Sequence, residues 1–100
     1  MNIEWTRWAI NEWIESLDYL EHESPSAAAR ISVAVVDTLI MLAADHPYAG
    51  HVGKITGTRE FAVPRSPFII GYELDRLSDT LTVIAVFDGR RRWPKTYPKE

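Results

Sequence analysis

Two long stretches in the first half of the chain repeat hydrophobic residues at helical spacing. In the first stretch the apolar positions recur after four, four and three residues, which is the period of one helix face. These positions are Ala9, Trp13, Leu17 and Leu20. In the second stretch the apolar face is formed by Ala28, Ile31, Val35, Leu39 and Leu42. We therefore predict two amphipathic helices, which end near Glu23 and His46.

The ends of both predicted helices carry residues that start or stop helices. Thr6 can accept a hydrogen bond from an unpaired backbone N–H of the first turn. Ser24 followed by Pro25 combines a capping hydroxyl with a proline at the first helical position, where no backbone donor is needed. Pro47 cannot continue the second helix. Because the connection between the helices is so short, we expect an antiparallel helical hairpin.

After Pro47 the hydrophobic pattern changes to a period of two, which is typical of strands, and a short strand is also expected before the hairpin. The predicted strands cover residues 2–5, 58–64, 68–74 and 81–87, with shorter extended segments around 52–56. Alternation along the last strand points Leu81, Val83 and Ala85 to one side of the sheet. Ile84 and Val86 then point to the other side, so this strand is apolar on both faces and is expected to be central.

These elements predict an α+β fold, in which an N-terminal strand is followed by an antiparallel two-helix hairpin packed on an antiparallel β-sheet meander. A chain of 100 residues can form one modest core but not two. We therefore expect 1–100 to be a single domain, with its core in 2–94 and a basic C-terminal tail over 90–100.

Charge is divided unevenly between the two halves of the chain. Residues 1–50 carry eight acidic and two basic side chains, for a net charge of −6, whereas residues 51–100 carry six acidic and nine basic ones, for +3. A basic C-terminal half favours an anionic partner, either nucleic acid or an acidic protein segment. Charged residues that simply lie on solvated faces would produce the same asymmetry.

The composition also excludes several kinds of site. There is no cysteine for disulfides, thiolate metal sites or nucleophiles, which fits a reducing cytoplasm. The start of the chain lacks the basic and apolar regions of a signal peptide, and the longest aliphatic stretches are far shorter than the ~20 residues that cross a membrane. Three scattered histidines offer no matched set of metal ligands. We expect a cytoplasmic protein without metal, cofactor or membrane contact.

Two segments carry side chains suited to binding. Residues 57–61 read Gly-Thr-Arg-Glu-Phe, which places Arg59 and Glu60 at the start of a strand. Residues 88–94 read Asp-Gly-Arg-Arg-Arg-Trp-Pro, so three arginines and Trp93 follow the expected central strand. Guanidinium groups form paired hydrogen bonds with phosphates or carboxylates, and an indole can stack on a base or anchor an interface. Salt bridges and core packing would account for the same residues without any binding role.

The order of the segments along the chain resembles that of the RelE/ParE toxin superfamily, and most closely its ParE-like, or plasmid-stabilisation, branch. The resemblance runs from Ile3 to Pro94, through Ile-Glu-Trp-Thr, Ser-Pro-Ser-Ala-Ala-Ala-Arg, His-Pro-Tyr-Ala-Gly, Gly-Thr-Arg-Glu-Phe, Pro-Phe-Ile-Ile-Gly-Tyr and Val-Phe-Asp-Gly-Arg-Arg-Arg-Trp-Pro. It implies a toxin of a type II toxin–antitoxin system, neutralised by a small antitoxin whose C-terminal segment folds as it wraps the toxin.

Two activities occur in that superfamily: RelE-like members are ribosome-dependent endoribonucleases that cut messenger RNA, and ParE-like members inhibit DNA gyrase. Ribonuclease chemistry needs basic side chains at the scissile phosphate and a group that moves a proton. By the resemblance, the positions that carry such groups in RelE-like enzymes hold Glu60, Ala62, Ile69 and Asp88 in this chain. These departures favour gyrase inhibition, with the ribonuclease as the alternative and a toxin fold that has lost its toxicity as a third interpretation.

Candidate site residues follow for each role. For a ribonuclease, the remaining catalytic candidates are Arg59, Arg65, Arg91 and Tyr97. For contact with the target, gyrase or the ribosome and its mRNA, the candidates are Arg90, Arg91, Arg92, Trp93 and Lys95. For contact with the antitoxin, the candidates are Arg59 and Trp8, because Trp8 lies off the main apolar stripe of the first helix.

Overall fold

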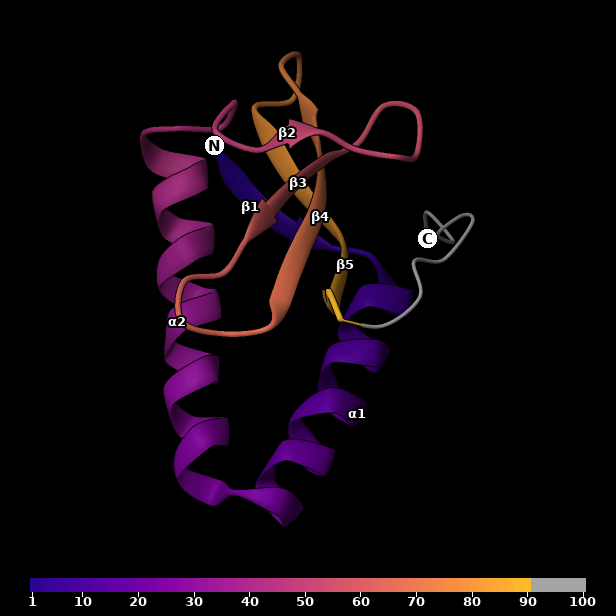
Figure 1. The fold of residues 1–100 in the computed structure, drawn as a ribbon. Coiled ribbons are helices and arrows are strands. Elements are labelled where there is room, and N and C mark those ends of the chain that lie inside the picture. The colour runs from indigo at the N-terminus through magenta and orange to yellow at the C-terminus, as the bar shows by residue number, and fades with distance from the viewer. Residues whose placement is uncertain (91–100) are drawn as a thin grey trace.

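The computed structural model describes residues 1–90, which form two helices and a five-stranded sheet (Figure 1). In chain order the elements are β1 (Asn2–Trp5), α1 (Arg7–Glu23), α2 (Pro25–Ala44), β2 (His51–Val52), β3 (Arg59–Ala62), β4 (Phe68–Asp75) and β5 (Thr80–Asp88). The strand order is β1-β5-β4-β3-β2. Strands β2 to β5 are antiparallel, whereas β1 pairs in parallel with β5, so the sheet is mixed. The α+β class is confirmed.

The helices begin where their capping residues predict. The hydroxyl of Thr6 accepts the N–H of Ala9 at 3.1 Å, and the hydroxyl of Ser24 accepts the N–H of Ala27 at 3.3 Å. Each contact satisfies a backbone donor of the first turn that has no partner within the helix. Ser24 also ends α1, since its own N–H donates to the carbonyl of Leu20.

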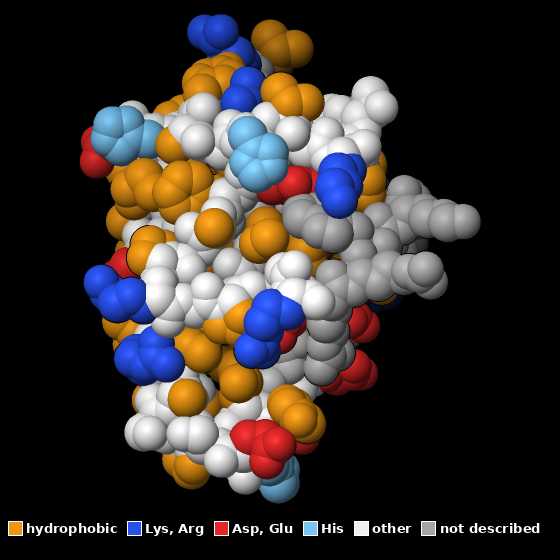
Figure 2. All heavy atoms as spheres, in the orientation of Figure 1, with side chains coloured by type: hydrophobic (Ala, Val, Ile, Leu, Met, Phe, Trp, Pro, Cys, Tyr) orange, Lys and Arg blue, Asp and Glu red, His pale blue; other side chains and the backbone are white. Residues whose placement is uncertain are grey.

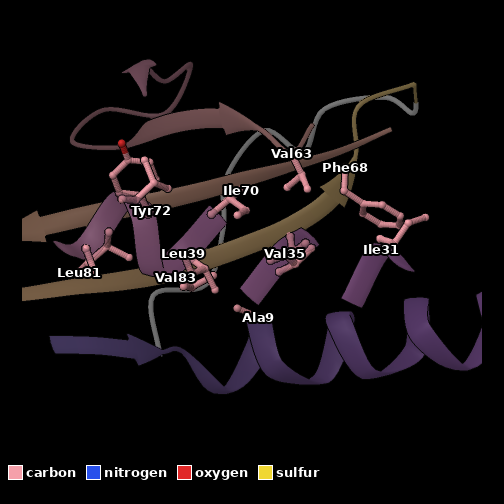
Figure 3. Close-up of a cluster of buried hydrophobic side chains, with 13 residues drawn as sticks. Ala9, Ile31, Val35, Leu39, Val63, Phe68, Ile70, Tyr72, Leu81 and Val83 are labelled. Atoms are coloured by element: carbon pink, nitrogen blue, oxygen red, sulfur yellow. The ribbon is translucent and has the colours of Figure 1, made fainter. Parts of the chain in front are cut away.

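Both helices pack on one face of the sheet and form the main core with it. The five residues predicted for the apolar face of α2 are all buried. Figure 3 shows Val35 and Leu39 of α2 opposite Ile70 and Val83 of the sheet, with Ala9 of α1 closing the cluster. The core therefore lies in a layer between the helical hairpin and the two longest strands, β4 and β5.

Strand β5 contains a bulge that reverses the alternation predicted from the sequence. Gly71 pairs with Ala85, but the next residue of β4, Tyr72, pairs with Val83, so Ile84 has no partner on β4. An extra residue of this kind turns the following side chains to the opposite faces. Val86 consequently joins the core with Val83, whereas Ala85 packs beside Ile84 on the other face. The orientations predicted for Ala85 and Val86 were wrong.

The segment between α2 and β3 is less extended than predicted. Only His51 and Val52 form a strand, and the residues around 52–56 otherwise lie in a turn. Gly57 has a φ of 84°, which glycine adopts without steric strain, and the chain turns there into β3. The extended segment predicted over 52–56 is therefore reduced to β2.

By length and composition alone, α2 is apolar enough to cross a membrane, with a mean hydropathy of 1.8. Core helices of soluble proteins meet the same criterion, and seven residues of α2 are buried in this fold. The hydropathy is high because the outer side of the helix is apolar as well. Val33, Val36 and Ile40 are all exposed there.

Candidate functional site

The sheet face opposite the helices brings together positions that the resemblance associates with ribonuclease chemistry. Ala62 of β3 pairs with Ile69 of β4, which pairs in turn with Phe87 of β5. Side chains paired in this way lie next to one another on one face of a sheet. The neighbouring Phe61 packs into the helix-covered core, so this row lies on the opposite face. The three side chains are apolar, and none of them can bind a phosphate or transfer a proton.

Glu60 lies on the same face, and its side chain is only 1% exposed. One carboxyl oxygen accepts the backbone N–H of Lys54 at 3.2 Å, and the other lies 3.2 Å from Nε2 of His51. The sequence analysis allowed salt bridges for Arg59 and Glu60 without naming their partners, and in the structure the side chain paired with Glu60 is that of His51. Glu60 therefore holds the turn between β2 and β3 against the sheet.

The guanidinium of Arg59 is directed at the loop between α2 and β2. Its Nη1 donates to the carbonyl of Gly50 at 2.8 Å and, at 3.4 Å, to that of Tyr48. The same guanidinium lies 4.8 Å from the centre of the Tyr48 ring, within the range of a cation–π contact. Arg59 thus has intramolecular partners for its charge and for one of its donor groups.

Tyr72 completes this arrangement, although sequence reasoning assigned it no role. Its hydroxyl donates to the carbonyl of Pro47 at 2.8 Å and accepts the N–H of Gly50 at 3.0 Å. In Figure 3 its oxygen points out of the apolar cluster. Burial raises the pKa of Tyr72, while the hydrogen bond from Gly50 and the charge of Arg59 oppose that rise. No local pattern marks this tyrosine, because its partners lie more than twenty residues away.

The two catalytic candidates among the described arginines, Arg59 and Arg65, do not converge on one point. Arg59 is the first residue of β3, and Arg65 lies in the turn beyond the other end of that strand, with a φ of 57°. At about 3.3 Å per residue, the stretch from Arg59 to Val63 alone spans about 13 Å. The carbonyl of Arg65 accepts a hydrogen bond from Arg30 at 2.8 Å, so this turn is attached to α2.

Of the residues predicted to contact the target, the described part of the chain includes only Arg90. Its side chain is exposed and pairs with Asp88, with Nη2 and Oδ2 2.7 Å apart. This carboxylate raises the pKa of Arg90, which therefore keeps its positive charge. The other candidates lie outside the described residues: Arg91, Arg92, Trp93, Lys95 and Tyr97.

Trp8 already has a packing role in the free chain. It is partly buried and packs against Ile84 and Ala85, next to the bulge of β5. Trp5 and Trp13 are partly buried as well, but they pack against the main core. Among residues 1–90 no group of three or more histidine, cysteine or acidic side chains could hold a metal ion.

Comparison with known proteins assigns the fold and its class. Residues 3–93 match the family described as "ParE toxin of type II toxin-antitoxin system, parDE". A curated protein of Sinorhizobium fredii named "Putative toxin Y4kP" is 34% identical over 93 residues, which is 93% of either chain. A solved chain from "Chromosomal ParDE TA system from P. aeruginosa" has the same fold, with a TM-score of 0.74 at 19% identity, over 88% of this chain and 95% of that one.

The fold and these matches define a toxin of a ParDE-type toxin–antitoxin system. The chain belongs to the ParE toxin family of type II toxin–antitoxin systems. Membership of this family implies that an antitoxin is its partner.

Proposed function

We propose that this toxin acts in the cytoplasm by binding and inhibiting DNA gyrase, and that its cognate antitoxin neutralises it by binding. One observation carries the choice of gyrase over messenger RNA. Ala62 and Ile69, two positions where the resemblance places catalytic groups of a ribonuclease, are paired and apolar on the sheet face opposite the helices, and the apolar Phe87 lies next to them.

The two described candidate arginines, Arg59 and Arg65, support the same choice. A phosphoryl transition state is stabilised by cations that converge on one site. Arg59 donates instead to the carbonyl of Gly50, and Arg65 lies beyond the far end of the same strand. A ribonuclease would therefore have to draw its catalytic groups from residues 91–100, where Arg91 and Tyr97 remain candidates.

For the target-contacting region we propose the basic segment that follows β5. Arg90 is exposed at its start, and the sequence continues with Arg91, Arg92, Trp93 and Lys95. Arginine and tryptophan are the residues that most often dominate the energy of protein interfaces. A segment rich in both suits a protein target with an acidic surface.

The decisive experiment is pulse-labelling of DNA and protein synthesis after sudden induction of the chain in a bacterial host. Gyrase inhibition predicts that DNA synthesis stops first, together with induction of the DNA-damage response. A collapse of protein synthesis while DNA synthesis continues would instead establish the ribonuclease activity. Co-expression of the antitoxin should restore growth in either case.

A supercoiling assay with purified gyrase tests the same proposal directly. We expect the wild-type chain to inhibit the enzyme, and we expect replacement of Arg90, Arg91 and Arg92 by alanine to abolish that inhibition. Arg76→Ala is the matched control, because Arg76 is exposed in the turn between β4 and β5. Equal inhibition by the wild-type chain and the triple variant would show that this segment does not contact gyrase.

A further inference from the structure

Helix α2 has a second apolar face that the core does not use. Val33, Val36 and Ile40 are 60%, 54% and 54% exposed, and the exposed Ala29 continues the row toward the start of the helix. From Ala29 onward these residues follow one another after four, three and four positions. That spacing is the one that forms the seam between two helices of a coiled coil.

Two opposite charges flank the row on the same side of the helix. Arg30 and Asp37 are both exposed and are separated by seven residues, so they occupy equivalent positions of successive heptads. Next to them, an open hollow of about 400 Å³ separates α2 from Pro64 and Arg65. In Figure 2 this side of the molecule, over α2 in the left half of the view, shows hydrophobic side chains next to basic ones.

We propose that this face of α2 binds the same face of a second copy of the chain, with the two helices antiparallel. A two-fold axis between residues 34 and 35 would place Val33 opposite Val36 of the second copy. The same axis would place Ala29 opposite Ile40. In this arrangement Ala29 leaves room for the larger Ile40 of the second copy, and Val33 faces a valine of equal size. The two helices can therefore approach closely.

The flanking charges explain why the partner is a second copy and why its direction is antiparallel. In the antiparallel arrangement, Arg30 of each copy lies near Asp37 of the other, which gives two opposite-charge pairs. In a parallel arrangement, Arg30 and Asp37 of one copy would lie on the opposite flank of the seam from those of the other copy, so these pairs could not form. The face is thus complementary to itself in only one orientation.

The size of the face predicts a weak dimer. A helix of 20 residues is about 30 Å long, and one helix face buries less than the ~1,600 Å² of a standard protein interface. We therefore expect dissociation constants on the order of micromolar rather than nanomolar. Because the dimer would depend on the whole seam, replacing one apolar residue of the seam should raise the dissociation constant by a measurable amount.

Sedimentation velocity of the purified chain, from low to several hundred micromolar, tests the proposal. We expect a reversible monomer–dimer equilibrium, and we expect Ile40→Lys to raise its dissociation constant at least about tenfold, because two apolar side chains leave each dimer. Ile14→Lys is the matched control. It also replaces an exposed isoleucine by lysine, but Ile14 lies on α1, where it is 58% exposed. Circular dichroism verifies that both variants fold.

Exchange of the two charges distinguishes a second copy from any other occupant. Asp37→Arg alone and Arg30→Asp alone should each weaken the dimer, since each creates like-charge pairs, and the double variant should restore it. Asp37→Arg leaves the hydrogen bond between Arg30 and the Arg65 carbonyl in place, so its effect is separate from any change in that turn.

Three results would overturn the proposal. The first is a wild-type chain that stays monomeric at all concentrations, and the second is an equal effect of Ile14→Lys and Ile40→Lys. The third is a double charge variant that does not recover dimer formation, together with single variants, Asp37→Arg and Arg30→Asp, that weaken antitoxin binding. That last result would assign this face of α2 to the antitoxin.

Discussion

The hydroxyl of Tyr72 and the backbone of Gly50 join the middle of the sheet to the loop that follows α2. Gly50 donates its N–H to the tyrosine oxygen at 3.0 Å, and a Cβ atom at position 50 would lie 2.5 Å from that oxygen. Such a distance is closer than two non-bonded atoms of this kind can approach. The loop can therefore reach Tyr72 only because residue 50 has no side chain.

Gly50→Ala should lower the free energy of unfolding by about 1–3 kcal/mol, because the added methyl group forces Tyr72 or the loop to move. Urea denaturation of the purified chain measures the change. Ala49→Ser, one residue away at an exposed position, is the control, and its effect should stay within about 0.5 kcal/mol. Equal effects of the two substitutions would show that the close approach to Tyr72 is not constrained.

Tyr72→Phe should change how stability depends on alkaline pH. Burial raises the pKa of Tyr72 above its ordinary value of 10.0, so the folded state binds this proton more tightly than the unfolded state does. The resulting stabilisation is complete below about pH 10 and is lost as the pH rises through the folded-state pKa. The wild-type chain should therefore lose stability above pH 10 more steeply than the variant.

At neutral pH the same variant should be less stable than the wild-type chain by about 1–3 kcal/mol, because the Gly50 N–H loses its acceptor and the Pro47 carbonyl loses its donor. Tyr19→Phe is the control, since the Tyr19 side chain is exposed on α1. Thermal melts across the alkaline range for both variants measure the difference. Identical pH profiles for Tyr72→Phe and the wild-type chain would refute the assignment.

Glu60→Ala should release the turn between β2 and β3. The substitution removes the acceptor of the Lys54 N–H, at a cost of about 1–3 kcal/mol, and hydrogen exchange at that amide should accelerate. His51→Ala is the control, because it leaves the Glu60 carboxylate and its hydrogen bond from the Lys54 N–H in place. In that variant the protection of the Lys54 amide should be retained.

Arg59→Ala should reduce stability and toxicity together. The guanidinium holds the carbonyl of Gly50, so its loss should cost about 1–3 kcal/mol, and growth inhibition should fall only as far as the amount of folded protein falls. Arg65→Gly is the comparison, since glycine accepts the positive φ of that turn and should cost little. Thermal melts and growth assays of both variants provide the readouts. A stable but non-toxic Arg59→Ala variant would indicate direct contact with the target.

The candidate site was only partly predictable from the sequence. Arg59 and Glu60 attract attention as charged neighbours at the start of a strand, but their partners, Gly50 and His51, are set by the path of the loop that precedes β3. Tyr72 gave no signal, because its hydroxyl meets a loop that is distant in sequence. Pairing of Ala62 with Ile69 could be anticipated from the hairpin, whereas their row with Phe87 required the register of β5.

The sequence by itself determined the features that depend on residues within about one turn of each other. The helix faces and the caps at Thr6 and Ser24 are of this kind, because their hydrogen bonds and packing periods are local. Tertiary structure decided the parallel pairing of β1 with β5 and the bulge at Ile84. Both depend on how strands that are far apart in the chain align over one core, and no local period encodes that alignment.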